Sequence, residues 1–275
     1  MTHRPPAREG ISPRKVVLQA VVPADTEYFA AAAGDSPFSP GQLLPAGMAL
    51  SGPVPAWYHP DVPEEKPIPF DYTVLYEDRD LIVVDKPHFL PTTSNGRLVR
   101  ETLQTRLRVD FGEDDIVPLH RLDRLTAGVV VCSRNPRTRG TYQRLFAERK
   151  VVKTYHARLS TCLEYSGTVE LPMHKVKGSR QVSLGGTPTL THVEAHGYAA
   201  SLIPHTGHTH QLRVVCNYLG APIQGDDTYP IDRGLDLYDF SSPLQLVAHR
   251  LEFADPLSGT RREFSTSRQL GGNLN

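Results

Sequence analysis

One carboxylate in this sequence stands in a setting suited to chemistry. Asp123 is flanked by Arg121 and Arg124 and comes shortly before the apolar run Val129 to Cys132, which predicts a buried strand. A carboxylate next to a buried strand can act as a nucleophile or stabilise an electron-deficient carbon. In isolation, an Asp at such a point more often caps a turn. The sequence around Asp123 is therefore needed to distinguish these two roles.

A second group suited to chemistry contains His205, His208 and His210. Clustered imidazoles favour a metal site, and a metal-dependent hydrolase is therefore one alternative. The spacing argues against it, because His208 and His210 are two residues apart across a predicted helix start and no HExxH pattern or acidic cluster stands nearby. We expect neither a metal nor another cofactor.

Composition predicts a cytoplasmic globular protein. No apolar run is long enough to span a membrane, and no apolar segment follows the basic residues at the start, so we expect neither a membrane span nor a secretory signal. The cysteines, Cys132, Cys162 and Cys216, are odd in number and widely spaced, which argues against a disulfide framework.

Positive charge is concentrated in one part of the chain. Lys and Arg together equal Asp and Glu at 30 each, so the net charge is zero. Between residues 121 and 153, however, nine basic residues stand against two acidic ones, a net charge of +7. Such a stretch favours contact with nucleic-acid phosphates, although a solvated helix face can have the same composition.

Residues 1–70 differ from the rest of the chain in composition and hydrophobic pattern. They hold 13 of the 24 prolines and show no sustained hydrophobic period. We expect a Pro-rich N-terminal extension that buries little by itself, within which Lys15 to Leu18 can add a strand. Residues 71–275 are expected to form the main domain.

Short strand patterns alternate irregularly with helical ones after residue 70. Asn135 and Pro136 predict a helix start, and Gly220 a left-handed helix end. This arrangement predicts an α+β fold with a mixed, largely antiparallel sheet, flanking helices and a central cleft. The expected strands are 74–76, 81–84, 129–132, 151–159, parts of 181–204, 244–253 and 261–264; the expected helices are 99–109, one after residue 135 and one from residue 209.

Six segments in order resemble one enzyme family over about residues 70 to 270. Residues 120–128 read HRLDRLTAG and resemble the HRLDRxTSG signature of RluA-type RNA pseudouridine synthases. The other matching segments are residues 81–87 (LIVVDKP), 153–155 (KTY), 206–214 (TGHTHQLRV), 219–226 (LGAPIQGD) and 248–264. The resemblance implies the fold of that family.

Three positions depart from the family pattern. Ala127 stands where the family usually has Ser, His208 where it usually has Arg, and Val215 where His commonly follows. None of them replaces an expected catalytic group. Many relatives also carry an S4-type RNA-binding domain, of which residues 1–70 show no clear sign.

The resemblance assigns catalytic roles to three residues. It implies that Asp123 is the carboxylate that acts on the ribose of a flipped-out uridine, either by adding to it or by assisting removal of the 2′ proton. Arg213 is expected to pair with this carboxylate and keep it ionised. Tyr155 is expected to stack on the target base, with a hydroxyl able to handle the C5 proton. The alternative for Arg213 is a surface arginine, and for Tyr155 ordinary strand packing.

The same resemblance implies a set of RNA contacts. Arg121 matches the residue that enters the RNA stack, and Leu212 supports the base, unless it only packs in the core. The neighbouring motif residues His120, Arg124 and Lys153 are expected to bind substrate as well. The implied partner is ribosomal or transfer RNA, and the expected state is a monomer. A catalytically impaired RNA-binding protein of the same fold is the remaining alternative.

Overall fold

The computed structural model describes residues 4–94 and 96–271. These residues form two compact units. The first contains the residues up to Lys66 together with Ser94–Asp114, and the second contains Pro67–Thr93 and the residues from Asp115 on. The sequence predicts a domain boundary at residue 70. Residues 1–3, 95 and 272–275 lie outside the described ranges.

The first unit is built on a small antiparallel sheet in the order β1-β4-β2-β3. Its strands are β1 (Arg14–Leu18), β2 (Tyr28–Ala30), β3 (Leu43–Leu44) and β4 (Val54–Tyr58). Side chains from one face form a buried cluster with Leu18, Tyr28 and Leu44 among its members. The expectation that this segment buries little by itself is therefore wrong. Because its strands have only two to five residues, they show little periodicity in the sequence.

Helix α1 (Leu103–Phe111) also belongs to the first unit. The hydroxyl of Thr102 accepts a hydrogen bond from the N–H of Thr105 at its start, and Gly112 ends it with a φ of 63°. The predicted helix over 99–109 is confirmed in kind, but it begins four residues later because the Thr102 cap sets its start.

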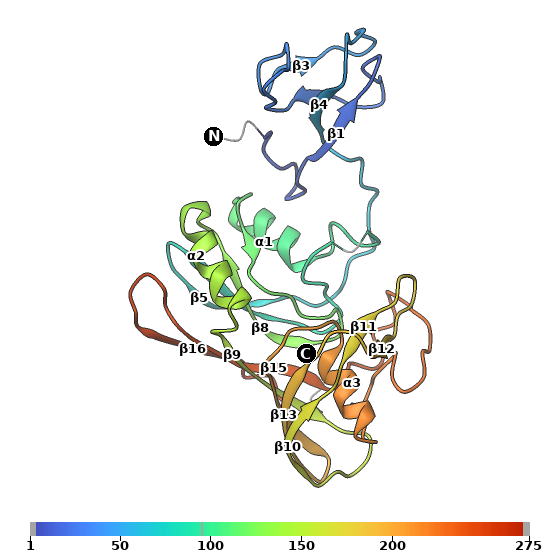
Figure 1. The fold of residues 1–275 in the computed structure, drawn as a ribbon, viewed down its shortest axis with the longest axis vertical. Helices are drawn as coiled ribbons and strands as arrows, with labels where there is room; N and C mark the ends of the chain where they lie inside the picture. Colours follow the sequence, from blue (N-terminus) through green and yellow to red (C-terminus); the bar gives the residue numbers. More distant parts are fainter. Residues whose placement is uncertain (1–3, 95, 272–275) are drawn as a thin grey trace. The chain divides into compact units, whose positions relative to one another are not determined.

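The second unit is built on a mixed sheet. The described residues give it ten strands, in the order β10-β13-β14-β9-β15-β8-β6-β5, with β16 beside β15 and β7 beside β8. Figure 1 labels β10, β13, β9, β15, β8, β5 and β16 of this sheet. All of the pairings are antiparallel except that of β15 with β8. The strands are β5 (Thr73–Glu77), β6 (Leu81–Lys86), β7 (Val117–Pro118), β8 (Ala127–Ser133), β9 (Val152–Arg158), β10 (Tyr165–Glu170), β13 (Leu190–His196), β14 (Ala199–Pro204), β15 (Leu246–Ala254) and β16 (Arg261–Ser265). A separate hairpin pairs β11 (Met173–Lys175) with β12 (Val182–Leu184).

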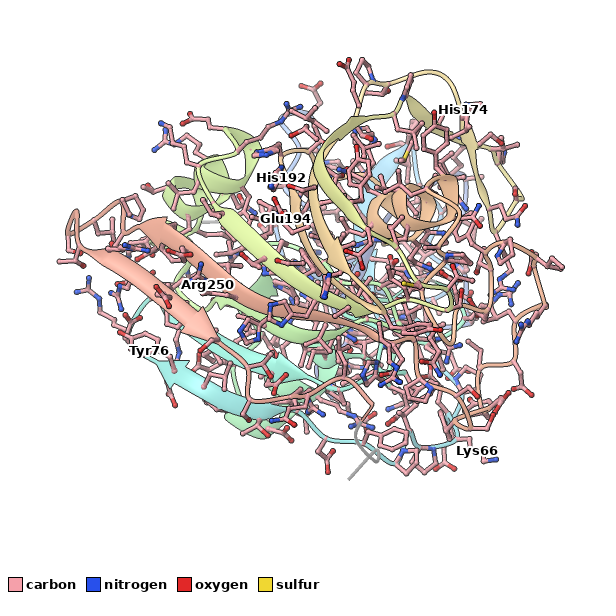
Figure 2. All side chains as sticks on the ribbon, turned by 90° about the horizontal axis from the view of Figure 1, so that it is seen from below. Lys66, Tyr76, His174, His192, Glu194 and Arg250 are labelled. Atoms are coloured by element: carbon pink, nitrogen blue, oxygen red, sulfur yellow. The ribbon has the colours of Figure 1, made fainter. Side chains whose placement is uncertain are left out.

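Two helices accompany this sheet. Helix α2 (Pro136–Ala147) starts at the Asn135 cap, as predicted, and packs Tyr142 and Leu145 into a cluster with side chains of β6, β8 and β15. Helix α3 (Gln211–Tyr218) contacts β14. Strand alternation leaves polar side chains on an open face, as for His192 and Glu194 of β13, which are hydrogen-bonded to each other (Figure 2).

The predicted α+β class with a mixed, largely antiparallel sheet is confirmed. The expected strands near residues 74, 81, 129, 151, 244 and 261 all form, whereas β7, β10 and β11 of the second unit were missed. Strand β7 has only two residues, and β10 and β11 carry exposed polar residues, so their sequences lack a strong apolar alternation.

The parallel pairing at the middle of the sheet depends on one glycine. Gly128 has a φ of 114°, and a Cβ placed on it would lie 2.3 Å from the carbonyl oxygen of Ala248. Ala248 is its register partner on β15, and Tyr155 of β9 is the partner of Ala248 on the other side. A residue without a side chain is therefore required for β8 to approach β15.

Replacing Gly128 with Ala should destabilise the protein by about 2–5 kcal/mol, since it adds both backbone strain and a steric clash. Urea unfolding would measure this loss. Gly140→Ala is the matched control, because Gly140 lies on α2 with nothing within 4 Å of an added Cβ, and it should be neutral or slightly stabilising. Equal effects of the two substitutions would contradict the role of Gly128.

Candidate active site

A tight loop between β7 and β8 carries Asp123. The hydroxyl of Thr92 accepts from the N–H of Leu122 at 3.0 Å and donates to its carbonyl oxygen at 2.9 Å. On the other side, the N–H of Thr126 donates to the Asp123 carbonyl oxygen at 3.0 Å. The Asp123 side chain is 32% exposed. The backbone around Asp123 is thus fixed, while its carboxylate remains open to a reaction partner.

The side chain of Arg213 is buried on α3 and held by a carboxylate. Its Nε and Nη2 donate to the two carboxylate oxygens of Asp226 at 2.8 and 2.6 Å, and Nη2 also reaches Asp227 at 2.9 Å. Burial alone disfavours the charge, but the hydrogen bonds to Asp226 and the neighbouring carboxylates outweigh it and raise the pKa of Arg213. Arg213 is therefore a permanent buried cation.

Two nitrogen atoms face the Asp123 carboxylate. Nη1 of Arg213 lies 3.7 Å from Oδ2 of Asp123, and Nε2 of His210 lies 3.9 Å from the same oxygen. Both distances exceed those of direct hydrogen bonds. The guanidinium still attracts the carboxylate at this range, and the oxygen keeps its lone pairs for a substrate.

The ring of His210 is oriented by Tyr229. The Tyr229 hydroxyl accepts from the N–H of Val182 at 2.7 Å and lies 3.2 Å from Nδ1 of His210. When this hydroxyl donates its proton to Nδ1, His210 carries its own proton on Nε2, on the side of Asp123. Burial lowers the pKa of His210, which favours the neutral ring at neutral pH.

Tyr155 comes to the site from β9. It is 9% exposed and lies opposite Ala248 on one side and Leu202 on the other. Burial, and to a smaller extent the charge of Asp123, raises the pKa of Tyr155. The phenol is therefore protonated at neutral pH, which suits it to stacking and hydrogen-bond donation better than to taking up a proton.

A fully buried lysine lies behind the loop of Asp123. Nζ of Lys86, at the end of β6, donates to the carbonyl oxygens of Pro87 at 2.9 Å, Leu90 at 2.7 Å and Arg124 at 3.4 Å. Burial lowers the pKa of Lys86 to about 7, although the charge of Asp123 opposes this shift. Lys86 thus links the turn after β6 to the residue next to Asp123.

His120 and Lys153 gather around an aromatic ring rather than around Asp123. The His120 ring stacks on Phe146 with centroids 5.1 Å apart, and its Nε2 accepts from the N–H of Val131 at 3.1 Å. Burial lowers the pKa of His120 to about 3, and Nζ of Lys153 lies 5.9 Å from the Phe146 centroid. These contacts give His120 a role in holding the loop.

The other three residues expected to bind substrate differ in their exposure and in their contacts. Arg121 is exposed and, within the described residues, has no hydrogen bond or ion pair. Arg124 donates to the carbonyl oxygens of Asp236 and Leu237 at 3.3 and 3.4 Å. Leu212 is buried on α3. Arg121 alone among these three is unengaged on the surface.

The histidine group does not gather as a unit. His210 faces Asp123 and Tyr229, whereas the backbone N–H of His208 donates to the Gln211 side chain. Over residues 4–94 and 96–271, no three His, Cys, Asp or Glu side chains are arranged to hold a metal ion. No helix of these residues is long and apolar enough to cross a membrane.

Three residues of the site were not singled out from the sequence: Lys86, Asp226 and Tyr229. His210 was considered only as a metal ligand. Lys86, His210 and Asp226 lie within the matched motifs, which was the one signal available for their roles at Asp123. Tyr229 follows Asp226 closely, and the N–H groups of Thr228 and Tyr229 donate to Oδ1 of Asp226 at 2.8 and 2.9 Å. These roles depend on tertiary contacts that a linear pattern does not contain.

The chain is similar to known proteins of one enzyme family. Residues 80–218 match the sequence model of a family described as RNA pseudouridylate synthase. The dual-specificity RNA pseudouridine synthase RluA of Vibrio vulnificus is 33% identical over 202 residues, which cover 67% of this chain and 78% of that protein. The tRNA pseudouridine(31) synthase of Saccharomyces cerevisiae is 26% identical over 210 residues, covering 64% of this chain and 51% of that protein.

A solved structure agrees with the sequence matches. Human RNA pseudouridylate synthase domain containing 1 superimposes with a TM-score of 0.59 at 27% identity, covering 72% of this chain and 84% of that one.

The buried ion pair of Arg213 yields a stability prediction. Asp226→Asn removes the charge that compensates a buried guanidinium and should cost about 3–5 kcal/mol in urea unfolding. Asp232→Asn is the control, since Asp232 pairs with Arg180 at the surface and its loss should cost less than about 1 kcal/mol. Similar small losses in both variants would show that Arg213 does not depend on Asp226.

Proposed function

Since this chain belongs to the RNA pseudouridylate synthase family and isomerises uridine in RNA to pseudouridine, we propose that Asp123 is the carboxylate that acts on the ribose. Membership of this family argues against the metal hydrolase, whereas the tritium-release experiment below tests the impaired RNA-binding protein. The single observation that carries the proposal is the convergence of the Arg213 guanidinium and the His210 ring on one oxygen of Asp123.

The reaction explains why a carboxylate is needed. The bond from C1′ to N1 breaks, the base turns within the site, and C1′ joins C5; the C5 proton leaves and N1 gains one, so no net oxidation or reduction occurs. During this exchange the sugar is electron-deficient at C1′. Asp123 can add to C1′ or take the 2′ proton, and both routes need an ionised carboxylate beside the sugar.

Basic side chains gather around the Asp123 carboxylate. Arg213 is held by Asp226 with Nη1 left toward Asp123, and Lys86, whose pKa is lowered to about 7, is charged in part at neutral pH behind the loop. Nε2 of His210 lies on the same side of the carboxylate. As the carboxylate approaches the sugar, these donors orient it and need little rearrangement, which is the condition for electrostatic preorganisation.

The remaining residues are proposed to receive the extruded nucleotide. Tyr155 is protonated and lies near enough to respond to the charge of Asp123, which supports stacking beneath the base. Arg121 is exposed and has no hydrogen bond or ion pair within the described residues, which supports its insertion into the RNA stack. The side chain of Arg124, in the same loop, donates to the carbonyl oxygen of Asp236. Because His120 and Lys153 surround Phe146, we propose that they shape the loop.

The target is proposed to be ribosomal or transfer RNA. The names of the relatives support this range, since one is a dual-specificity RNA pseudouridine synthase and another a tRNA pseudouridine(31) synthase. The monomeric state and the cytoplasmic location expected from the sequence stay predictions.

Asp123→Asn should slow isomerisation at least about 1,000-fold, because the amide neither adds to C1′ nor takes a proton. RNA that carries tritium at uridine C5 reports the reaction directly, since isomerisation releases that tritium. The variant should unfold in urea close to the wild-type midpoint, because the Asp123 side chain is partly exposed.

Asp239→Asn serves as the matched control for this experiment. Asp239 is an exposed Asp of the same unit whose carboxylate accepts the N–H of Ser241, and its replacement should leave tritium release unchanged. Tritium release by Asp123→Asn at a rate near that of Asp239→Asn would exclude Asp123 as the acting carboxylate.

A further inference from the structure

The small sheet of the first unit has a second face opposite its buried cluster. Because side chains alternate along strands, Lys15, Phe29, Leu43 and Trp57 point away from the cluster that contains Leu18 and its neighbours. Lys15 pairs with Trp57, Trp57 with Phe29, and Phe29 with Leu43. One continuous row, which we call the aromatic row, therefore crosses all four strands.

The aromatic row is open and positively charged. Leu43 is 50% exposed, and Trp57 and Phe29 are partly exposed. Cζ of Arg4 lies 5.8 Å and Nζ of Lys15 5.9 Å from the Trp57 ring centroid. Among the described strand residues on this face, which also include Val17 and Pro55, none is acidic.

This combination is the one that proteins use for single-stranded nucleic acid. Aromatic rings on a sheet surface accept stacked bases, and neighbouring cations neutralise phosphates. Because the net charge of the whole chain is zero, general attraction to RNA is weak and a local stacking surface gains importance. Cations that rest on the Trp57 ring can turn to the phosphates when a base takes their place.

We propose that the aromatic row binds a single-stranded segment of RNA, with bases stacked on Trp57 and Phe29 and phosphates near Arg4 and Lys15. The proposal rests on the proposed function only in that the enzyme encounters RNA. The stacking surface lies in the first unit and uses none of the residues around Asp123.

Trp57 is the only tryptophan of the sequence, so the tryptophan fluorescence of the protein reports on this surface alone. The full-length Asp123→Asn chain would be titrated with a fluorescein-labelled single-stranded oligouridylate of twelve nucleotides. Binding is followed by anisotropy of the label, and unlabelled RNA is used to follow tryptophan emission. We expect saturable quenching of Trp57 with the same midpoint as the anisotropy change, and weaker binding at higher salt.

Three results would overturn the proposal. The first is RNA binding without any change in Trp57 emission, and the second is absence of binding to the single strand. The third is protection of Trp57 from acrylamide in the free enzyme, which would mean that protein covers this face. If the wild-type enzyme still releases tritium while one of these results is obtained, the proposed function stands and only the proposed RNA binding by the aromatic row is refuted.

Variants of the row provide an independent check. Phe29→Ala removes one stacking ring and should weaken oligouridylate binding about fivefold or more. Lys15→Ala, at an exposed position, tests the phosphate contact without changing the core and should reduce the salt dependence. Val21→Ala is the control, since Val21 is 49% exposed in the same unit but lies outside the row, and it should bind as the wild type does. Equal binding by all three variants would contradict the proposal.

Discussion

The bidentate ion pair between Arg213 and Asp226 determines where positive charge lies in the active site. A guanidinium with 3% of its side chain exposed is tolerated only if a carboxylate compensates it. Asp226 is fixed in turn by two backbone N–H groups, and Gly225 before it has a φ of 77° where a Cβ would lie 2.3 Å from the Pro243 carbonyl oxygen. The geometry leaves Nη1 of Arg213 facing Asp123.

The central strands bring the remaining groups to the same place. Asp123 precedes β8, Tyr155 lies on β9, and Ala248 of β15 stands between Gly128 and Tyr155 in the register. The close approach at Gly128 therefore sets how the loop of Asp123 lies relative to the ring of Tyr155. Lys86, at the end of β6, ties the same loop to a third strand through carbonyl oxygens.

Local signals predicted the parts of this protein that depend on local physics. The Asn135 cap, the buried strand before α2 and the turn between β15 and β16 could all be predicted from neighbouring residues. The four-stranded sheet of the first unit could not, because its strands are short and its core is assembled from distant segments. Asp123 and Arg213 could be singled out by resemblance, but the support of Tyr229 for His210 depends on packing between separate segments.

The central claim is that Arg213 acts through Asp123. A double-mutant cycle with Asp123→Glu and Arg213→Lys, measured as single-turnover tritium release from C5-labelled RNA, tests it most directly. If the two side chains act as one unit, the double variant should be about as slow as the slower single variant. If the two losses multiply, Arg213 works independently of Asp123 and the claim is wrong.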